Sequence, residues 1–496
     1  MKNTVMALGM AFGLVFTLAG CATLQTPLQG SPATLAPTPP AAWQSPLPHN
    51  GKVSDLAQWW RGLNDPLLVQ LIEAAQQTSG ALADAQARIA QARATRVGAG
   101  AALGPTLDGS ASASRGVVQP SAGPSGGPAT SVSLGGQASW EVDLFGGNRA
   151  TATAAQARLD SAQAAWHEAR VSIAAEAAGQ YLSQRNCEAQ LRVTQADAAS
   201  RAESAQLAEL TAKAGFTAPA TADLARASAA DGAARVTEQR TQCQRDVLAL
   251  SALIAVPVTE IQAVLKQKPP PTLADTAQAA LFSIAILPAD VVAQRPDVYQ
   301  AEREVLAASA EVTASDAQRL PRLSLNGSIG AARVVGSGVS SDGTTWSIGP
   351  IALSLPLFDG GRRTANLQAA RARYEAAVVN YRSKARQAVA EVEIALLNLQ
   401  STASRQGDAQ NAATGYRASF NAAQARYKAG LGSLLELEDA RRTLLAAETG
   451  LVSLQRERMA AGIALYRAAG GGWDVNANAV TQLANDSVAA TQMAKP

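Results

Sequence analysis

The sequence contains one structural unit twice, and this duplication constrains the fold more than any other feature. Residues 212–226, AKAGFTAPATADLAR, align with residues 425–442, ARYKAGLGSLLELEDARR, at an offset that pairs Gly215 with Gly430. Other segments match at the same offset or within a residue or two of it: 156–166 with 371–381, 143–149 with 356–362, and 103–110 with 320–328. Because an internal repeat decides how every other segment is assigned, we interpret the chain as two tandem copies of one unit.

Each copy contains a long helical run, a turn and a shorter helical run that returns. Residues 148–214 and 362–429 contain no proline, and a helix of this length would span about 100 Å. The returning runs cover residues 218–255 and 433–469. Helices of this length without internal capping signals are typical of coiled coils. The sequence therefore predicts two antiparallel helical hairpins, one in each copy.

Each copy also contains a pair of segments in which apolar and polar residues alternate. The first pair is 105–118 and 130–144, and the second is 321–335 and 345–358. Such alternation is typical of a transmembrane β-strand, with apolar residues toward lipid and polar residues toward a lumen. A soluble sandwich strand would alternate too, but the neighbouring helical runs are too long for a compact sandwich domain. The alternation slips at residues 349–350, which predicts a bulge or bend.

Four strands in one chain cannot close a barrel, because each open edge would leave unpaired backbone groups inside the bilayer. Several copies must therefore contribute to one barrel, and cyclic symmetry closes it most simply. Three copies would supply twelve strands and leave an open lumen. The predicted fold class is an α+β membrane channel-tunnel, in which a trimeric twelve-stranded β-barrel continues into a long α-helical periplasmic coiled-coil barrel.

The N-terminus has the pattern of an export signal. Lys2 precedes an apolar run that is too short for a comfortable transmembrane helix. The tetrapeptide LAGC, residues 18–21, resembles the bacterial lipobox, in which cleavage leaves Cys21 as the lipid-carrying residue. The alternative is an ordinary signal whose cleavage site happens to contain a cysteine. Ala22 stands where aspartate would signal retention in the inner membrane, so the resemblance implies an outer-membrane lipid anchor.

The other two cysteines, Cys187 and Cys243, are equidistant in sequence from Gly215. Residues equidistant from the turn of an antiparallel helical hairpin lie side by side, within reach of a disulfide if their Cβ atoms converge. An exported chain is in a compartment that permits disulfides. The alternative is two independent buried thiols, since free cysteine is often buried. The symmetry and the compartment favour the disulfide.

The order of elements and several motifs resemble the TolC-like outer-membrane efflux protein family, in particular the lipoprotein branch that serves resistance-nodulation-division pumps. The motifs are the lipobox at Cys21, WWR at 59–61, LF at 144–145 and 357–358, RPD at 295–297, and the turns at Gly215 and Gly430. The resemblance covers nearly the whole mature chain. It implies a homotrimeric outer-membrane channel with a long periplasmic extension.

The resemblance also implies that the channel docks on a periplasmic adaptor protein and an inner-membrane resistance-nodulation-division transporter. Such a channel passively conducts drugs or other toxic small molecules to the exterior. One alternative is the outer-membrane channel of a one-step protein secretion system. A second, from a different class, is a trimeric coiled-coil structural protein without a channel. The sequence does not name the exported substrate.

Roles for residues of the two turns follow from the same resemblance. Tyr427 matches the family's tip tyrosine, and Glu436 and Asp439 match its acidic aperture positions, where three copies would form rings of negative charge in a periplasmic gate. Gly432 stands where some members have arginine, and Thr221 matches Glu436 in the first copy, so the bonds of the lock would differ here. Ordinary solvated charges on a helix flank are the alternative. The predicted adaptor-docking residues are Lys213, Gly215, Thr217, Lys428, Gly430 and Ser433.

Composition argues against other functions. The two histidines, His49 and His167, provide little material for a metal site or a catalytic triad. The formal net charge of +3 is small and evenly spread, which does not favour nucleic acid as a partner. Glycine-rich stretches lack the spacing of phosphate-binding loops. We therefore expect no enzyme activity, no cofactor and no metal.

Six segments are expected along the chain. They are a lipoprotein signal peptide (1–20), a lipid-anchored extended leader (21–55), a first repeat (56–256) with its tip near 215, a linker or equatorial segment (257–286), a second repeat (287–472) with its tip near 430, and a flexible C-terminal tail (473–496).

Overall fold

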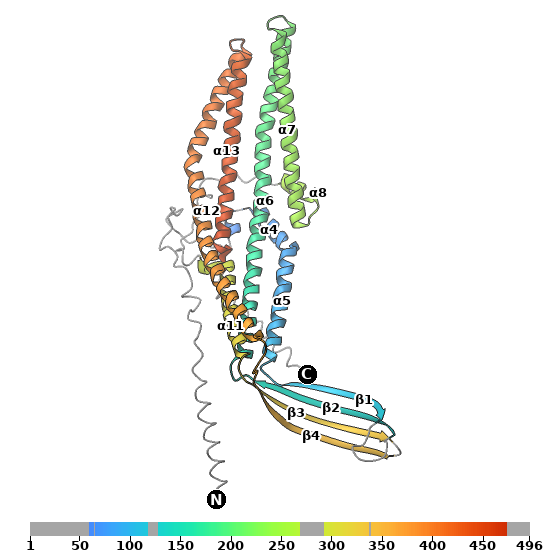
Figure 1. Ribbon diagram of the computed structural model, residues 1–496. Coiled ribbons are helices and arrows are strands. Elements are labelled where there is room, and N and C mark those ends of the chain that lie inside the picture. Colours follow the sequence, from blue (N-terminus) through green and yellow to red (C-terminus); the bar gives the residue numbers. More distant parts are fainter. Residues whose placement is uncertain (1–58, 64, 118–126, 268–291, 337–338, 474–496) are drawn as a thin grey trace. The chain divides into compact units, whose positions relative to one another are not determined.

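The computed structural model describes residues 59–473 except residues 64, 118–126, 268–291 and 337–338 (Figure 1). The predicted signal peptide with Cys21, the leader, most of the linker and the tail after residue 473 lie outside the described residues. The chain forms two compact units. The strand unit comprises Arg96–Ala157 and Glu304–Arg382, and the hairpin unit comprises the other described residues.

The strand unit contains a four-stranded antiparallel sheet in the order β1-β2-β3-β4 (Figure 1). The strands are β1 (Thr106–Val117), β2 (Pro128–Val142), β3 (Arg322–Gly336) and β4 (Val339–Ser354). The two predicted repeats meet at its centre, because β2 belongs to the first and β3 to the second. The outer edges of β1 and β4 pair with no other described strand.

The two faces of the sheet differ in polarity, because directly opposite residues of paired strands point to the same side. On one face the hydroxyl groups of Ser112 and Ser133 lie 2.8 Å apart, and those of Ser328 and Ser347 also lie 2.8 Å apart. We call this side the serine face. The other face carries exposed apolar side chains, including Leu134, Ile329, Trp346 and Ile348. The alternation predicted from the sequence is therefore present in the sheet.

The ends of β4 differ from the predicted segment 345–358. The strand begins earlier, because the polar residues of the predicted loop pair with β3: Ser340 is opposite Val335, and Asp342 is opposite Arg333. It ends at Ser354, so residues 355–358 lie outside the sheet. The predicted bulge is present, since residues 349–350 together lie opposite Asn326. The other three strands agree with prediction to within two residues at each end.

Two helical hairpins repeat the same design (Figure 1). The first is α6 (Gly147–Lys213) with α7 (Pro219–Ile254), and the second is α12 (Arg362–Lys428) with α13 (Leu434–Ala468). Both turns use a glycine with positive φ, 80° at Gly215 and 73° at Gly430. The residue after each glycine donates a backbone hydrogen bond across the turn. The amide of Phe216 donates to the carbonyl of Thr211 at 2.9 Å, and the amide of Leu431 donates to the carbonyl of Arg426 at 2.8 Å. This is the glycine-dependent helix ending that satisfies the last free carbonyl groups.

Short helices accompany the hairpins. They are α3 (Trp59–Gly62), α4 (Pro66–Thr78), α5 (Gly80–Ala101), α8 (Val258–Gln267), α11 (Pro296–Ala317) and the 3-10 turn η4 (Gly470–Gly472). The predicted helix start at Asp65 is present, since its carboxylate accepts hydrogen bonds from the amides of Leu67 and Leu68. Among the described residues no single helix has the length and apolarity to cross a bilayer, whereas α7 and α8, bent by 113°, meet that criterion only as a pair.

Buried aromatic residues build the core of the hairpin unit. Trp59 stacks on Tyr466 with ring centroids 5.0 Å apart, and the edge of Trp60 meets the same ring at 4.7 Å. The WWR motif therefore joins the start of the unit to the end of α13.

Arg295, from the RPD motif, ties the start of α11 to the second hairpin. Its guanidinium contacts Asp297 and Glu391, each at 2.7 Å, and donates to the carbonyl of Ala468 at 3.0 Å. A Cβ added to Gly470, which has a φ of 82°, would lie 2.6 Å from the carbonyl oxygen of Gln294. The glycine at position 470 therefore leaves room for the backbone of Gln294 and Arg295 to approach the end of α13.

Candidate functional site

The predicted docking residues lie in two separate turns. At the first, Lys213 pairs with Glu209 at 2.8 Å, and the hydroxyl of Thr217 lies 3.1 Å from that of Thr211. At the second, the hydroxyl of Ser433 caps α13 by accepting from the amide of Glu436 at 3.1 Å. Gly215 and Gly430 form the reversals described above. These residues give each turn a defined shape.

Lys428 connects the two hairpins. Its Nζ lies 2.6 Å from Oε1 of Glu203 on α6. Both side chains are about half exposed, so the pair is solvated and worth at most about 1 kcal/mol.

Each turn also exposes a large apolar side chain that sequence reasoning missed. Phe216 is 82% exposed and Leu431 is 74% exposed. Leu435, the second residue of α13, is exposed to the same extent as Leu431. Phe216 and Leu431 each follow a turn glycine and occupy equivalent positions in the two repeats. This equivalence was the sequence signal that could have identified them. Leu431 and Leu435 thus place two exposed apolar side chains at the second turn, and exposed apolar patches mark interaction sites.

The predicted gate residues have different surroundings. Tyr427 is half-buried and packs against Leu434 and Leu437 of α13. Burial raises the pKa of its hydroxyl. Glu436 accepts from Arg426 at 2.9 Å, and the exposed Asp439 pairs with Arg442. Each acid is therefore partly neutralised by an arginine of its own hairpin.

Glycine at position 432, where some family members have arginine, has a steric reason. A Cβ at this position would lie 3.3 Å from both Cβ of Arg426 and the backbone nitrogen of Tyr427. The turn thus folds back closely on the end of α12. An arginine here would need the turn to open slightly.

A buried polar cluster behind the second turn joins the two hairpins. Arg441 is 2% exposed and donates through Nη2 to the hydroxyl of Ser204 at 2.7 Å and the carbonyl of Ser200 at 3.2 Å, both on α6. Its Nη1 contacts Glu438. Glu438 in turn lies 3.0 Å from Nη1 of Arg201 on α6. We call Arg201, Glu438 and Arg441, with the serines that they contact, the inter-hairpin cluster.

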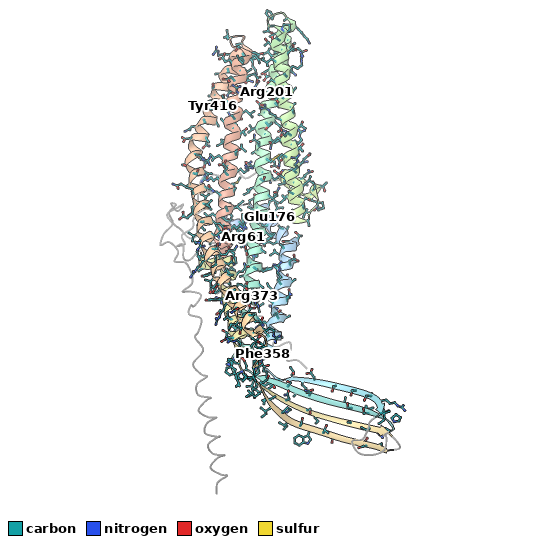
Figure 2. All side chains as sticks on the ribbon, viewed as in Figure 1. Arg61, Glu176, Arg201, Phe358, Arg373 and Tyr416 are labelled. Atoms are coloured by element: carbon teal, nitrogen blue, oxygen red, sulfur yellow. A yellow bond between two sulfur atoms is a disulfide. The ribbon has the colours of Figure 1, made fainter. Side chains whose placement is uncertain are left out.

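Arg201 occupies the first hairpin's side of this cluster (Figure 2). It is buried, pairs with Asp197 at 2.8 Å and donates to the hydroxyl of Ser228 on α7 at 2.6 Å. Gly232 on α7 makes room for it, because an added Cβ there would lie 2.9 Å from Cδ of Arg201. Any larger residue at position 232 would therefore force Arg201 to shift.

The electrostatics of the cluster follow from its burial. Burial lowers the pKa of the Arg441 guanidinium, while the charge of Glu438 opposes this effect. Within the described residues, the Nε atom of Arg441 has no hydrogen-bond partner. A cluster of this kind favours one arrangement of the helices, since removing any partner leaves a buried charge uncompensated. From the sequence we predicted roles for the neighbouring exposed acids, Glu436 and Asp439, but not for this buried cluster.

The first hairpin has a covalent link. Cys187 on α6 and Cys243 on α7 are joined by a disulfide, with Cα atoms 5.5 Å apart. The structure thus contains the pairing that the equidistant spacing favoured. In the part of the chain that the structure describes, no group of three or more His, Cys, Asp or Glu residues is placed to hold a metal ion.

A sheet with one apolar and one polar face, combined with two long helical hairpins, defines one chain's share of an outer-membrane channel-tunnel. The chain belongs to the outer membrane efflux protein family, whose profile matches residues 71–256 and 287–471. The family model thus matches the chain in two separate segments.

Curated relatives and solved structures agree with this family assignment. The pyoverdine export outer membrane protein OpmQ of Pseudomonas putida is 30% identical over 93% of this chain and 97% of its own length. The solvent efflux pump outer membrane protein SrpC of Pseudomonas putida is 31% identical over 84% of this chain and 87% of its own. The structure of VceC from Vibrio cholerae matches with a TM-score of 0.73 and 28% identity over 84% of this chain and 99% of VceC. The protein is an outer-membrane efflux channel, as the motifs predicted.

Proposed function

We propose that three copies of this chain form the outer-membrane channel of a tripartite efflux pump. The observation that carries the proposal is the sheet, whose edge strands β1 and β4 pair with no other described strand. An unpaired strand edge is too costly to leave in hydrocarbon, so β1 of one copy pairs with β4 of the next. Three chains of four strands close a twelve-stranded barrel with an aqueous lumen.

The helical hairpins of the three copies continue as a periplasmic tunnel. Exposed apolar residues on α12, such as Ile394 and Leu397, pack against other helices in this assembly. Conduction is passive, and the chain performs no chemistry of its own. A lipid on Cys21 anchors the chain to the outer membrane.

The gate lies at the second turn, around Tyr427, Glu436 and Asp439. The arginine partners of the two acids reduce the repulsion among three copies, which lets the tips approach one another. The inter-hairpin cluster holds α13 against α6 behind this gate. Opening therefore requires the second hairpin to move relative to the first.

The turns are the docking surface for a periplasmic adaptor that connects the channel to an inner-membrane resistance-nodulation-division transporter. Phe216 and Leu431 supply exposed apolar area. Lys213, Thr217, Lys428 and Ser433 surround them with polar groups, and the glycines hold the turns tight. An apolar centre with a polar rim is the usual composition of a protein interface.

The exported compounds are drugs or other toxic small molecules. Relatives named for pyoverdine export and for solvent efflux share this fold at similar identity, so the channel itself imposes little choice. Selection among compounds then lies with the inner-membrane transporter.

Conductance of the purified protein in planar bilayers tests the proposal. We expect discrete pores from a species with the mass of a trimer, and a deletion strain that becomes more sensitive to a broad panel of toxic compounds. A trimer without conductance would refute the channel and favour a coiled-coil structural protein. A deletion strain that keeps its resistance but loses secreted proteins would favour protein secretion instead.

A further inference from the structure

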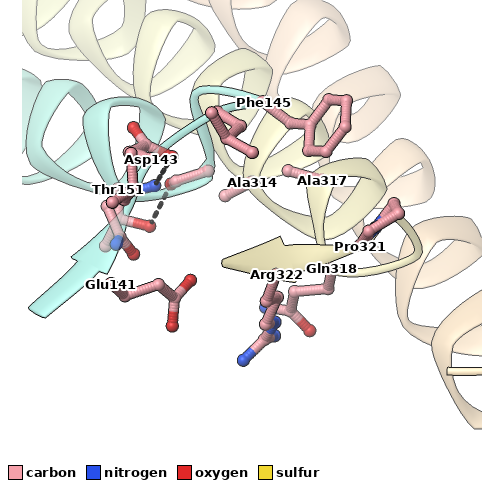
Figure 3. A pocket seen from close by; sticks show the side chains of 13 residues that line it. Glu141, Asp143, Phe145, Thr151, Ala314, Ala317, Gln318, Pro321 and Arg322 are labelled. Atoms are coloured by element: carbon pink, nitrogen blue, oxygen red, sulfur yellow. Dashed lines mark hydrogen bonds between the residues drawn. The ribbon is translucent and has the colours of Figure 1, made fainter. Parts of the chain in front are cut away.

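A small pocket lies in the strand unit, where β2 ends and β3 begins next to helices (Figure 3). The pocket has a volume of about 240 Å³. It is lined by the last residues of β2, the first residue of β3, the start of α6 and the end of α11. Glu141 from β2 and Arg322 from β3 project on the same side of the sheet. The pocket therefore combines opposite charges from two neighbouring strands.

Both charges belong to the serine face. Glu141 is directly opposite Ser324, and Arg322 lies two residues before Ser324, so the two are diagonal neighbours about 7–8 Å apart at Cα. Within the described parts of the four strands, the only other charged residue on this face is Asp108, which does not line the pocket. The serine face is otherwise nearly neutral.

Both charged residues are exposed and have no protein partner within the described chain. Glu141 and Arg322 have no side-chain hydrogen bond or ion pair there, and they do not pair with each other. The side chain of Gln318, which also lines the pocket, likewise has no partner among the described residues. Three polar groups that can bind a solute thus converge on one cavity.

A second acid that lines the pocket, Asp143, is already engaged. Asp143 follows β2 and accepts hydrogen bonds from the amides of Asn148 at 3.2 Å and Arg149 at 2.9 Å, and its carboxylate pairs with Nε of Arg149 at 3.2 Å. Burial raises the pKa of Asp143, but these hydrogen bonds outweigh it and lower the pKa overall. Asp143 is therefore committed to the start of α6 and leaves Arg322 without a carboxylate.

The two helices that line the pocket are closely packed. A Cβ added to Gly147 would lie 3.0 Å from Cβ of Ala317, so α6 and α11 approach closely beside the pocket. Buried alanines continue this contact, with Ala154 and Ala157 packed against Ala307 and Ala310. The pocket does not need to be assembled by its ligand.

We propose that Glu141 and Arg322 form a binding site for small zwitterions, molecules that carry an ammonium and a carboxylate group. The carboxylate binds the guanidinium of Arg322, and the ammonium binds the carboxylate of Glu141. A solute with one charge can satisfy only one of the two groups, so the site distinguishes zwitterions from simple ions. The proposal rests on the proposed function, which turns the serine face toward the lumen.

The test measures the current through the purified full-length channel in planar bilayers while 4-aminobutyrate is added. We expect a saturable decrease in current that butyrate and butylamine do not produce at equal concentration. Glu141→Gln and Arg322→Gln should each weaken the effect about tenfold, because each removes one charge-assisted contact. The matched control Asp108→Asn removes a charge of the same face outside the pocket and should leave the effect unchanged.

The combined exchange of Glu141→Arg with Arg322→Glu distinguishes the site from a general effect of charge. It keeps both charges in the pocket and should retain the response to 4-aminobutyrate. A wild-type pore that conducts but responds equally to 4-aminobutyrate, butyrate and butylamine would overturn the zwitterion site and leave the channel intact. A wild-type protein that forms no pore would overturn the proposed function itself, and this site with it. If a single variant forms no pores, the comparison of the three solutes on the wild type still decides.

Discussion

Oε2 of Glu438, on the second hairpin, lies 3.0 Å from Nη1 of Arg201, on the first. The same carboxylate contacts Arg441, so one acid stands between two buried guanidinium groups. The exposed acids on either side of it, Glu436 and Asp439, pair with arginines of their own hairpin. Of the three neighbouring acids, Glu438 is the one that joins the two hairpins.

Glu438→Gln should therefore loosen the second hairpin. Removing one partner of a buried ion pair leaves uncompensated charge and typically costs about 3–5 kcal/mol. We expect a lower melting temperature by circular dichroism and a higher mean conductance in bilayers. Asp231→Asn on α7 is the control, because its exposed pair with Arg235 contributes about 0–1 kcal/mol. Equal effects of the two variants on conductance would contradict the role of the cluster.

Gly232→Val should disturb the same cluster from the other side. The new Cβ would start 2.9 Å from Cδ of Arg201, and the branched side chain needs still more room. We expect the variant to shift conductance in the direction of Glu438→Gln. Gly450→Ala on α13 is the control, since nothing lies within 4 Å of an added Cβ there. Its replacement should be neutral or stabilise the helix by about 1 kcal/mol.

The disulfide should contribute measurably to the stability of the first hairpin. It closes a loop with a sequence separation of 56 residues, for which a contribution of about 2–5 kcal/mol is expected. The double variant Cys187→Ser with Cys243→Ser should therefore melt at a lower temperature. Alkylation followed by intact-mass measurement checks the bond itself. Two cysteines that are modified without reductant would show that the bond is absent in the protein.

His167 should make the hairpin unit less stable in mild acid. Burial, and secondarily the charge of Arg170, lowers the pKa of His167 from 6.5 to about 4. The unfolded chain therefore binds a proton below pH 6.5 that the folded chain does not accept until about pH 4. Stability from this group is complete above pH 6.5 and is lost as the pH falls toward 4.

His167→Phe removes the group that binds this proton and keeps an aromatic ring against Trp166 and Trp473. The ring centroids of these two residues lie 4.9 and 6.0 Å from that of His167. The difference in melting temperature between wild type and variant should change across that window and stay constant above it. A constant difference from pH 7.5 to pH 4 would contradict the assignment.

Replacing both exposed apolar residues of the turns, Phe216→Ser with Leu431→Ser, should weaken binding to the cognate periplasmic adaptor by about tenfold or more. The melting temperature and the pore conductance should stay unchanged, because both side chains point into solvent. Surface plasmon resonance with purified adaptor measures the affinity. Leu248→Ser, an exposed apolar residue of α7 away from the turns, serves as the control.

The helical hairpins could be predicted from the sequence almost to the residue. Proline-free runs end at glycine turns, and α6 and α12 begin and end within one residue of the predicted bounds. Local chemistry decides these boundaries, since glycine alone adopts the required φ without strain. The early start of β4 could not be seen, because Ser340 and Asp342 are extended only through their pairing with β3.

The inter-hairpin cluster depends on contacts between distant parts of the chain. Arg441 and Ser204 are separated by 237 residues in sequence, so no local pattern brings them together. One signal was present, since Arg441 continues the buried stripe that Leu434 and Leu437 begin at helical spacing. An arginine on an apolar stripe indicates a buried partner, but not where that partner lies.

The disulfide also has a consequence for biogenesis. Cys187 and Cys243 are separated by 56 residues, whereas the contact between Ser139 and Asn326 in the middle of the sheet spans 187. Contacts that are close in sequence form sooner, because less chain entropy is lost in closing them. Oxidation of the first hairpin needs neither the second repeat nor another copy. This hairpin can thus be oxidised soon after export, before the strand edges of separate chains meet.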